Sequence, residues 1–307
     1  MQKQTVIVAH YDAFTTVPHR GNPAGVVLNA DAFTVDQMQN IAREMGFNET
    51  NFALKSDVAD VRLRYFTPGG EMNLCGHGTM ATLYALRTHG MLNDTAEDLT
   101  IETKAGILPI KMRWVDGQWL ITMQQAAPQF MPFNGSVQEL AASMGINEDD
   151  LDINLPIVYG STGNWTLLVP IRTREAFTRM NPRNEEFPAI LHEIPTSSVH
   201  PFCLETADEA ADMHARHFSS PHSGTVEDPV TGTASGVMGA YWMNFMTPDA
   251  KEVNLTVEQG LEMGRDGKVN VYVVRDEEGM RVEISGTAVF VEEVEIEMVV
   301  NNSASSD

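Results

Sequence analysis

Apolar and polar residues alternate along the first part of the chain with the periods of short strands and of one amphipathic helix. Residues 61–66 alternate cleanly, as expected of a strand with one buried face. An apolar stripe at helical spacing predicts a helix over 34–46, with Thr34 as its N-cap and Gly46 as its stop signal. Further β-branched or apolar runs predict strands at residues 5–11, 26–28, 51–54, 99–101, 107–112 and 119–123.

The rest of the chain shows a similar mixture of helix and strand patterns. A helix is predicted over 137–144, and Gly145 follows it as a stop signal. Strands are predicted at residues 157–159, 167–169, 253–257, 269–274, 281–284 and 289–296. The polar residues 301–307 are expected to form a disordered tail.

Two further predicted helices, at 79–86 and 237–246, are apolar nearly all round. A helix without a polar face is normally buried. We therefore predict an α+β fold of two pseudo-symmetric lobes, each with a mostly antiparallel sheet wrapped round one buried helix. The first lobe is expected over 1–126 and the second over 127–300, although the last strand could return to the first lobe.

A glycine-centred segment occurs twice, each time just before one of these apolar helices. The first copy contains Tyr65-Phe66-Thr67-Pro68, Glu71 and Cys75-Gly76-His77-Gly78-Thr79-Met80-Ala81, and the second contains His217-Phe218-Ser219-Ser220-Pro221, Glu227-Asp228-Pro229 and Thr231-Gly232-Thr233-Ala234-Ser235-Gly236. Residues 140–146 also echo 41–47. These echoes predict two similar lobes, with a small acidic ligand held between two helix N-termini.

Composition narrows the classes of function. The 307 residues are 43% hydrophobic and 20% charged, as in a globular protein with ample core. The formal charge of −22 argues against nucleic acid and anionic membranes as partners. A small anionic substrate remains compatible, because backbone N–H groups can bind a carboxylate locally. Two cysteines are too few for a disulfide scaffold, and no signal or membrane-spanning pattern is present, so we expect a cytoplasmic protein.

Candidate chemistry begins at the first glycine turn. Gly76 and Gly78 allow close backbone approach, and the first N–H groups of the following helix favour a carboxylate. His77 can exchange a proton near neutral pH, although a solvated turn histidine has the same sequence appearance. Glu49 lies in a loop before a strand, where an acid is usually exposed. In a closed apolar cleft it would have a raised pKa and could move protons.

The second turn offers a different set of polar groups. Asp228 precedes a proline, while Gly232 and Thr233 supply flexible backbone and a hydroxyl group. Asn22 and Asn164 lie in glycine-bearing loops, where their amides could bind a ligand. All of these are also ordinary turn residues, so each alone is a weak signal.

Five short segments, spread over most of the chain, stand in a characteristic order. They are Arg20-Gly21-Asn22-Pro23-Ala24-Gly25-Val26; Ile41-Ala42-Arg43-Glu44-Met45 leading to Glu49-Thr50; Arg64-Tyr65-Phe66-Thr67-Pro68 leading to Cys75-Gly76-His77-Gly78-Thr79; Glu227-Asp228-Pro229-Val230-Thr231-Gly232-Thr233-Ala234; and Gln259-Gly260 followed by Gly264-Arg265. Singly they are short, but jointly they are specific. Together they resemble the PhzF family of phenazine-biosynthesis-like isomerases.

The resemblance implies the diaminopimelate-epimerase-like fold, usually as a homodimer, and a cofactor-free isomerase acting on a small carboxylate metabolite. By position, Glu49 resembles the general acid/base of that family, and His77 and Asp228 match its other polar site residues. Thr233 stands where the phenazine enzyme has serine, so the hydroxyl is kept and the extra methyl narrows the site. The expected substrate-binding residues are Asn22, Gly76, Gly78, Asn164, Gly232 and Thr233, with no metal.

Two alternatives remain at this stage. Related epimerases use two thiols, and Cys75 lies where the first would be, but its counterpart in the second copy is Thr231, which cannot act as a thiolate. Cys75 is then either a reactive thiol or a small packing residue. The other alternative is a non-catalytic member that binds a metabolite or a protein partner. A Glu49 that points to bulk water would favour that reading, and a buried Glu49 would favour proton transfer.

Overall fold

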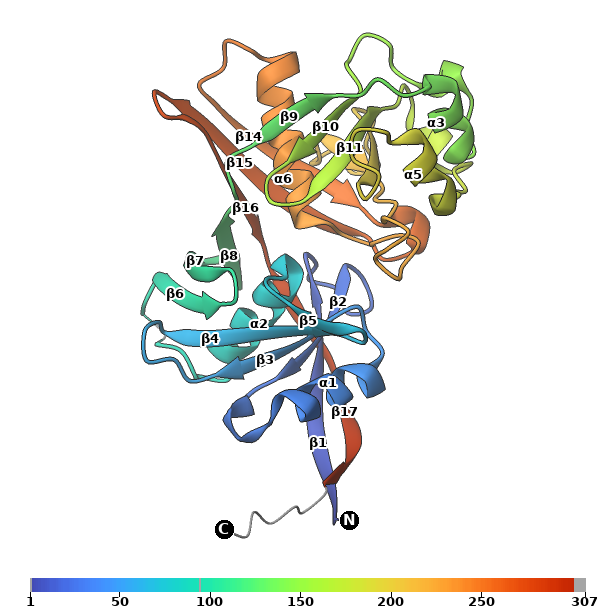
Figure 1. Cartoon of the computed structure of the whole chain (residues 1–307). Helices are drawn as coiled ribbons and strands as arrows, with labels where there is room; N and C mark the ends of the chain where they lie inside the picture. Colours follow the sequence, from blue (N-terminus) through green and yellow to red (C-terminus); the bar gives the residue numbers. More distant parts are fainter. Residues whose placement is uncertain (1, 94, 301–307) are drawn as a thin grey trace. The chain divides into compact units, whose positions relative to one another are not determined.

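The computed structural model describes residues 2–93 and 95–300, and within them the chain forms two compact units (Figure 1). Unit 2 comprises 20–22 and 122–286, and unit 1 comprises the described residues before, between and after these segments. The chain changes unit at 121/122, close to the predicted boundary at 126. The expected tail at 301–307 lies outside the described residues.

Unit 1 consists mainly of strands and two α-helices. Its strands are β1 (Gln2–Ala13), β2 (Asn22–Val27), β3 (Thr50–Leu54), β4 (Val61–Thr67), β5 (Gly70–Met72), β6 (Asp98–Thr103), β7 (Gly106–Val115) and β17 (Ala288–Val300), while β8 (Gln118–Gln124) leads from unit 1 into unit 2. Its helical segments are η1 (Ala30–Ala32), α1 (Val35–Met45) and α2 (Gly76–Thr88). The last strand pairs antiparallel with the first, so the end of the chain returns to unit 1.

The predicted start and stop signals of α1 are both present. Thr34 accepts a hydrogen bond from the Gln37 backbone N–H, and the Gln37 side chain accepts one from the Thr34 N–H, which forms a capping box. Gly46 ends the helix at φ 70°, a conformation that glycine adopts without steric cost. The buried face of α1 packs on a core that includes Phe52 and Phe66.

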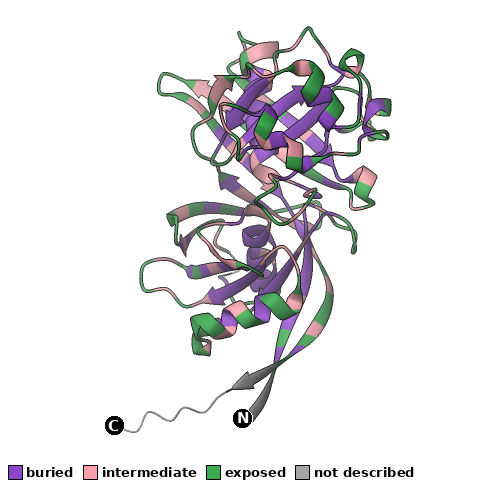
Figure 2. Ribbon diagram, turned by 45° about the vertical axis from the view of Figure 1, so that its right-hand side comes forward, coloured by how far each residue is buried: buried purple, intermediate pink, exposed green. Residues whose placement is uncertain are grey.

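Helix α2 is the buried helix of unit 1. Its residues are buried on nearly every side, and it packs against β1, β3 and β17. Ala81 and Ala85 contact a core that includes Tyr11 and Val26, and the small alanines allow close approach to the strands. Figure 2 shows the buried helix and the buried strand faces in purple.

Unit 2 contains the remaining elements. Its strands are β9 (Gln129–Pro132), β10 (Val158–Ser161), β11 (Trp165–Pro170), β12 (Ser198–Cys203), β13 (Met213–Ala215), β14 (Glu252–Gln259), β15 (Gly267–Asp276) and β16 (Gly279–Gly286). Its helical segments are α3 (Val137–Ser143), η2 (Glu148–Asp150), α4 (Arg174–Phe177), η3 (Asn184–Glu186), α5 (Phe187–Ile190), α6 (Gly232–Tyr241), the π-helical η4 (Trp242–Met246) and η5 (Leu261–Met263). Helix α6 packs against β10, β15 and β16 and is buried nearly all round, as predicted.

The two units repeat one order of strand pairing. In unit 1, β2–β3 is parallel, β3–β4 antiparallel, β4–β6 parallel and β6–β7 antiparallel. In unit 2, β11–β12, β12–β13, β13–β14 and β14–β15 follow the same sequence of senses. Antiparallel pairs predominate in each unit once the flanking pairs are included. The predicted repeat is therefore present as a shared topology.

The glycine-centred segments also repeat in side-chain detail. Arg64 binds Glu71 through two hydrogen bonds of 2.7 and 2.8 Å, and Arg216 binds Glu227 through two of 2.8 and 2.7 Å. Each guanidinium also lies over the phenylalanine two residues later, at 5.2 Å from the Phe66 ring centroid in one case and 4.9 Å in the other. The same pair of contacts therefore occurs in the segment that precedes each buried helix.

The shorter echo between 140–146 and 41–47 does not mark equivalent helices. Helix α1 lies between β2 and β3, whereas α3 lies between β9 and β10. By strand order, the segments that correspond to α1 are α4 and α5, between β11 and β12. A common apolar helix pattern ending at a glycine produced the echo.

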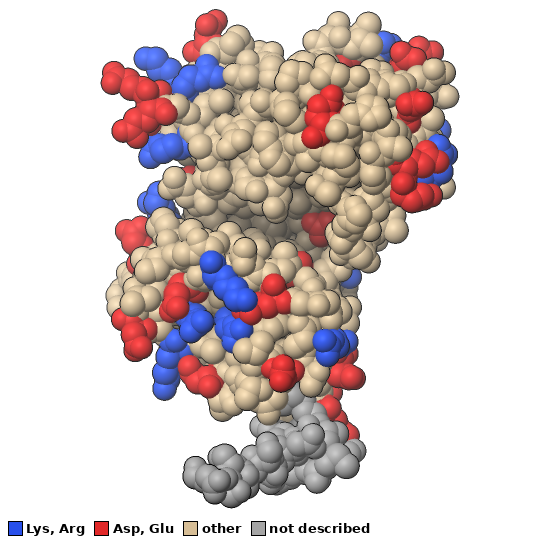
Figure 3. Space-filling view, in the orientation of Figure 1, with Lys and Arg blue, Asp and Glu red and all other residues tan. Residues whose placement is uncertain are grey.

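Acidic and basic side chains are scattered over the visible face of each unit (Figure 3). Among the described residues, no helix is long and apolar enough to cross a membrane.

Candidate functional site

The first group of predicted site residues lies in unit 1 at the start of α2. We call Glu49, Cys75 and His77 the Glu49 cluster. Glu49 directly precedes β3, and its backbone oxygen accepts a 3.1 Å hydrogen bond from the Gly25 N–H on β2. Cys75 is the N-cap of α2, and its Sγ accepts a 3.4 Å hydrogen bond from the Gly78 N–H. A strand pair and a helix start thus fix the backbone of all three residues.

The side chains of the Glu49 cluster are mostly buried and lie within contact distance. His77 Nε2 lies 3.1 Å from Glu49 Oε2, and the side chains are 11% and 14% exposed. Cys75 Sγ lies 3.4 Å from His77 Nδ1. The His77–Glu49 contact is close enough for an ion pair, yet this buried Oε2 atom has no hydrogen-bond partner among the described residues.

Surroundings set the charge states of this cluster. Burial alone lowers the pKa of His77, but Cys75 and the Glu49 carboxylate outweigh it and raise that pKa well above its usual range. Burial raises the pKa of the Cys75 thiol, so Cys75 remains a neutral thiol at neutral pH. We therefore assign the positive charge of His77 to its pairing with the Glu49 carboxylate.

The three groups of this cluster also have the donor types of a metal site. One donor atom from each lies within 4.8 Å of the others, and carboxylate, thiolate and imidazole all bind zinc. These are the residues that would hold an ion. The family resemblance predicts no metal, and we treat the cluster as an acid–base group.

The glycines of the first turn have different surroundings. A Cβ atom at Gly78 would lie 2.1 Å from Asn51 Oδ1, and the Gly78 N–H is already bonded to Cys75. Asn51 in turn donates a 2.9 Å hydrogen bond to the Gly25 oxygen. This glycine therefore permits packing on Asn51, and substrate binding at Gly78 stays a prediction. In the part of the chain that the structure describes, no atom lies within 4 Å of a Cβ added at Gly76, so this glycine leaves room for close approach.

The second group of predicted residues lies in unit 2 before α6. We call Asn22, Asp228, Thr231 and Gln259 the Asp228 cluster. Asp228 Oδ1 accepts a 2.8 Å hydrogen bond from Asn22 Nδ2, and Asp228 Oδ2 accepts one from the Thr231 hydroxyl. Both carboxylate oxygens are thus acceptors, as expected of an ionised carboxylate.

Asn22 supports this turn and does not line a surface. It is fully buried, and its Nδ2 also donates a 2.8 Å hydrogen bond to the Val230 oxygen. Asn22 therefore orients Asp228 through Nδ2, and direct substrate binding by Asn22 stays a prediction. Gly232 and Thr233 form the first turn of α6, which has no side-chain cap among the described residues. The sequence predicts that its first N–H groups bind a carboxylate.

Asn164 is exposed in the turn between β10 and β11. Within the described part of the chain, the structure shows no bond from its side chain to the Asp228 cluster. Thr162, two residues earlier, does reach α6 and donates a 2.9 Å hydrogen bond to the Thr233 oxygen. The hairpin therefore contacts the helix start through Thr162, which sequence reasoning missed.

Gln259 is the main residue of this cluster that sequence reasoning did not assign. It ends β14 and is fully buried. Its Oε1 accepts from the Thr231 N–H at 3.1 Å, and its Nε2 donates to the Asp228 backbone oxygen at 2.7 Å. The available signal was a strand that ends in Gln259-Gly260, one of the segments that carried the family resemblance.

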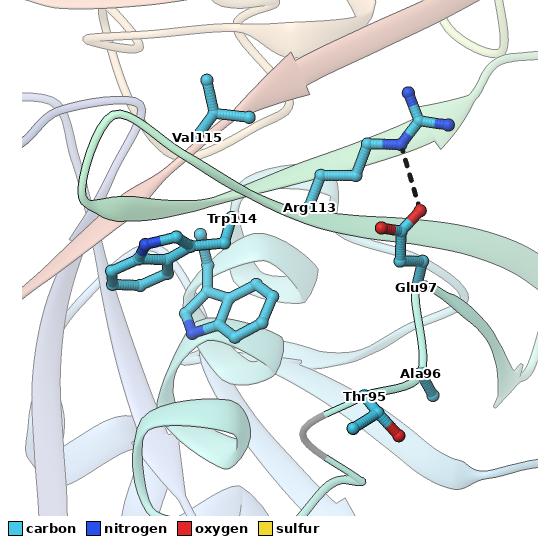
Figure 4. Close-up of a pocket in the computed structure, with 7 residues that line it drawn as sticks. Thr95, Ala96, Glu97, Arg113, Trp114 and Val115 are labelled. Carbon is cyan, nitrogen blue, oxygen red and sulfur yellow. Dashed lines mark ion pairs between the residues drawn. The ribbon is translucent and has the colours of Figure 1, made fainter.

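A separate cavity of about 380 Å³ opens on unit 1 (Figure 4). Its lining residues are Thr95, Ala96, Glu97, Arg113, Trp114, Val115 and Trp119. The Trp114 and Trp119 rings meet edge to face with their centroids 5.2 Å apart. Arg113 Nε lies 3.5 Å from Glu97 Oε2. None of these residues belongs to either cluster, so the cavity adds nothing to the candidate acid–base chemistry.

Comparison with known proteins connects this geometry to a family of sequences. Residues 11–294 match the PhzC-PhzF family, described as phenazine biosynthesis-like proteins. The Bacillus subtilis protein named uncharacterized isomerase YfhB is 52% identical over 285 residues, covering 93% of this chain and 96% of the relative. The trans-2,3-dihydro-3-hydroxyanthranilate isomerase of Pseudomonas chlororaphis is 29% identical over 286 residues, covering 91% and 96% respectively.

Solved structures agree with this grouping. The crystal structure of the Bacillus anthracis phenazine biosynthesis protein of the PhzF family is 56% identical, with a TM-score of 0.94, and the match covers 96% of this chain and 100% of the other. A hydroxyproline epimerase from Agrobacterium vitis is 13% identical, with a TM-score of 0.62 and coverage of 99% and 94%. The second likeness shows a shared fold, which is the predicted diaminopimelate-epimerase-like fold.

Proposed function

Because this chain belongs to the PhzF family of phenazine biosynthesis-like proteins and is an enzyme of the isomerase class, we propose that it moves a proton within a small carboxylate substrate without a cofactor. Glu49 is the general acid/base of this proposal. His77 assists it within unit 1. In unit 2, the groups that we propose for binding a carboxylate are Asp228 and the start of α6.

The largely buried Glu49 carboxylate, with Oε2 3.1 Å from His77 Nε2, is the observation that carries this proposal. A general base needs a free lone pair within reach of the proton that it abstracts. The side chain is largely buried, so water satisfies it poorly, and β3 and its neighbours hold its backbone in place. This arrangement supports proton transfer over the non-catalytic alternative, which predicted a Glu49 directed to bulk water.

The proposed reaction conserves every atom of the substrate. Glu49 takes a proton from one carbon and becomes a carboxylic acid, while the electron pair of the broken C–H bond spreads into the substrate as an enolate-like anion. Glu49 then returns the proton to another carbon, and the new C–H bond removes the anion. His77, held as a cation, stabilises the negative charge that Glu49 and the substrate share during these steps.

The thiols fit this reaction less well than Glu49 does. Burial raises the pKa of Cys75 and raises that of Cys203 to about 12, so neither is a thiolate at neutral pH. Cys75 also caps α2, while Thr231 is the N-cap of α6 at the corresponding place in unit 2. These observations favour a structural role for Cys75 over two-thiol racemisation.

The first experiment asks whether the enzyme exchanges carbon-bound hydrogen with solvent. The protein is incubated in deuterated water with trans-2,3-dihydro-3-hydroxyanthranilate, the substrate named for the Pseudomonas relative, and with a panel of other small unsaturated carboxylates. Proton NMR is expected to show deuterium entering one of them together with an isomerised product. A panel in which no carboxylate gains deuterium or isomerises would argue against the proposal.

A further inference from the structure

Gln259 contacts three groups of the turn that leads into α6. Its Oε1 accepts from the Thr231 N–H at 3.1 Å, and its Nε2 donates to the Asp228 backbone oxygen at 2.7 Å and to Thr231 Oγ1 at 3.3 Å. The side chain is fully buried. An amide has two N–H donors, and both are used here.

The orientation of this amide follows from its partners. A backbone N–H can only donate, and a backbone carbonyl can only accept. The Thr231 N–H therefore requires Oε1 on its side, and the Asp228 carbonyl requires Nε2 on the other. The amide of Gln259 has one possible orientation within this turn.

That orientation determines where the Thr231 hydroxyl points. Thr231 Oγ1 accepts a hydrogen bond from Gln259, so its own proton is free to go elsewhere, and it is donated to Asp228 Oδ2. The hydroxyl is thereby directed away from α6, although Thr231 is the N-cap residue of that helix. In unit 1 the corresponding residue, Cys75, does cap its helix by accepting from the Gly78 N–H.

Threonine is normally a good N-cap, because its oxygen accepts from an N–H group in the first turn. An uncapped helix start keeps those N–H groups available to an external anion. The difference between the two units therefore depends on what holds the Thr231 hydroxyl away from α6. The contacts identify Gln259 on one side and Asp228 on the other.

We propose that Gln259 is a positioning residue that holds the Thr231 hydroxyl on Asp228 and so keeps the start of α6 uncapped for the substrate carboxylate. The inference rests on the proposed function, because it assumes that this helix start binds the substrate. Gln259 touches no reacting atom in this account. It acts through Thr231 and through the Asp228 backbone.

The first test replaces Gln259 with methionine, which has a similar length and no hydrogen-bonding amide. Without Gln259, the Thr231 hydroxyl is expected to turn and accept from the Thr233 or Ala234 N–H, as in an ordinary N-cap. A crystal structure of Gln259→Met should show Thr231 Oγ1 within about 3.3 Å of one of those nitrogen atoms. The KM for a carboxylate substrate should rise about tenfold or more, with a smaller change in kcat, because the cap competes with substrate binding.

Asn270→Leu is the matched control for general destabilisation. Asn270 accepts a 3.2 Å hydrogen bond from Thr256 between β14 and β15, in the same strand pair but outside the turn. This variant should keep the wild-type KM even if it unfolds at a lower temperature. A rise in KM equal to that of Gln259→Met would attribute the effect to loss of stability and overturn the proposal.

The second variant, Gln259→Glu, keeps the size and the acceptor that binds the Thr231 N–H. A carboxylate cannot donate to the Asp228 oxygen, whereas a protonated carboxyl group can. The activity of Gln259→Glu relative to wild type should therefore increase as the pH is lowered from 8 towards 5. A relative activity that does not change with pH would overturn the role of the Gln259 donor. Unfolding of the same variant at each pH separates this effect from a loss of stability.

The two proposals fail in different ways. If Gln259→Met leaves the Thr231 hydroxyl on Asp228 in the crystal structure, or leaves KM unchanged, the role of Gln259 is wrong whether or not Glu49 is the base. If the structure changes as expected but acetate and benzoate bind wild type and variant equally well by calorimetry, the uncapped helix start does not bind carboxylates. Activity that persists in a Glu49 variant would overturn the proposed function while leaving the crystallographic result for Thr231 intact.

Discussion

His77 and Glu49 depend on one another for their charge. The pKa of His77 is raised because Cys75 and Glu49 outweigh the effect of burial. Because burial raises the pKa of Cys75 and keeps it a neutral thiol, Glu49 is the partner that carries the opposite charge, and its removal should lower the pKa of His77. The charge on His77 therefore reports directly on the state of Glu49.

We predict that Glu49→Gln lowers the pKa of His77, because the neutral amide cannot stabilise the imidazolium ion. Nitrogen-15 NMR of the labelled imidazole ring measures that pKa directly. The control is Glu44→Gln, which changes an exposed glutamate on α1. An unchanged His77 pKa in Glu49→Gln would show that Glu49 does not hold the imidazole charged.

At the scale of single elements, the start of α2 contains two glycines with different surroundings. Gly78 packs against the Asn51 side chain, whereas Gly76 faces open space. We predict that Gly78→Ala destabilises the protein by about 1–3 kcal/mol, because the added methyl would overlap the buried Asn51 amide. Gly76→Ala, at the first position of the same helix, has open space and should change stability by less than about 1 kcal/mol. Urea unfolding of both variants makes the comparison, and equal losses would contradict this packing.

The loop after β14 is held by a buried histidine between two carboxylates. His214 Nδ1 lies 2.8 Å from Glu258 Oε1, and Nε2 lies 3.0 Å from Glu262 Oε1. Burial lowers the pKa of His214, but these hydrogen bonds outweigh it and raise that pKa above 6.5. Burial raises the pKa of both glutamates, but their bonds to His214 lower each below 4.5.

This cluster predicts a pH-dependent contribution to stability. Because the pKa of His214 is raised on folding, its contribution to the free energy of unfolding is complete below pH 6.5. This stabilisation is lost as the pH rises through the pKa of His214 in the folded state. Because the pKa values of the two glutamates are lowered on folding, their contribution to the free energy of unfolding is complete above pH 4.5. This stabilisation is lost as the pH falls through their pKa values in the folded state. His214→Asn should therefore cost most between these limits, about 3–5 kcal/mol, and less at either extreme. A difference in unfolding free energy that is constant with pH would contradict this account.

The sequence predicted those helices and strands whose capping residues or apolar pattern lie within the element itself. The capping residues Thr34 and Gly46 and the apolar positions of α2 and α6 are such signals. Strand β12 was missed because Pro201 interrupts its pattern, and β13 was missed because it has only three residues. The environments of Gly78 and Gln259 depend on contacts with residues 27 and 28 positions away, which no local pattern contains.

At the scale of the whole molecule, the repeated arginine–glutamate pairs differ in one respect. Glu71 contacts both Arg64 and Lys104, whereas Arg216 binds Glu227 and also the carbonyl oxygens of Phe177 and Met180. Removal of Arg64 therefore leaves Glu71 with a second cation. Removal of Arg216 leaves both Glu227 and two carbonyl groups without this donor.

We predict that Arg216→Met destabilises the protein by about 3–5 kcal/mol and that Arg64→Met costs clearly less. Both substitutions keep an apolar side chain of similar length beside the phenylalanine ring. Chemical unfolding followed by circular dichroism compares the two variants. If both variants lose the same free energy of unfolding, Lys104 does not compensate for the loss of Arg64, and this prediction is wrong.

The central claim is that Glu49 carries the proton during isomerisation. The most direct measurement is the rate of deuterium incorporation from solvent into a carboxylate that the wild-type enzyme isomerises, compared among wild type, Glu49→Gln and Glu44→Gln. The account predicts that Glu49→Gln lowers this rate by about 10²–10⁴-fold while Glu44→Gln retains it. A folded Glu49→Gln enzyme that incorporates deuterium at the wild-type rate would contradict it.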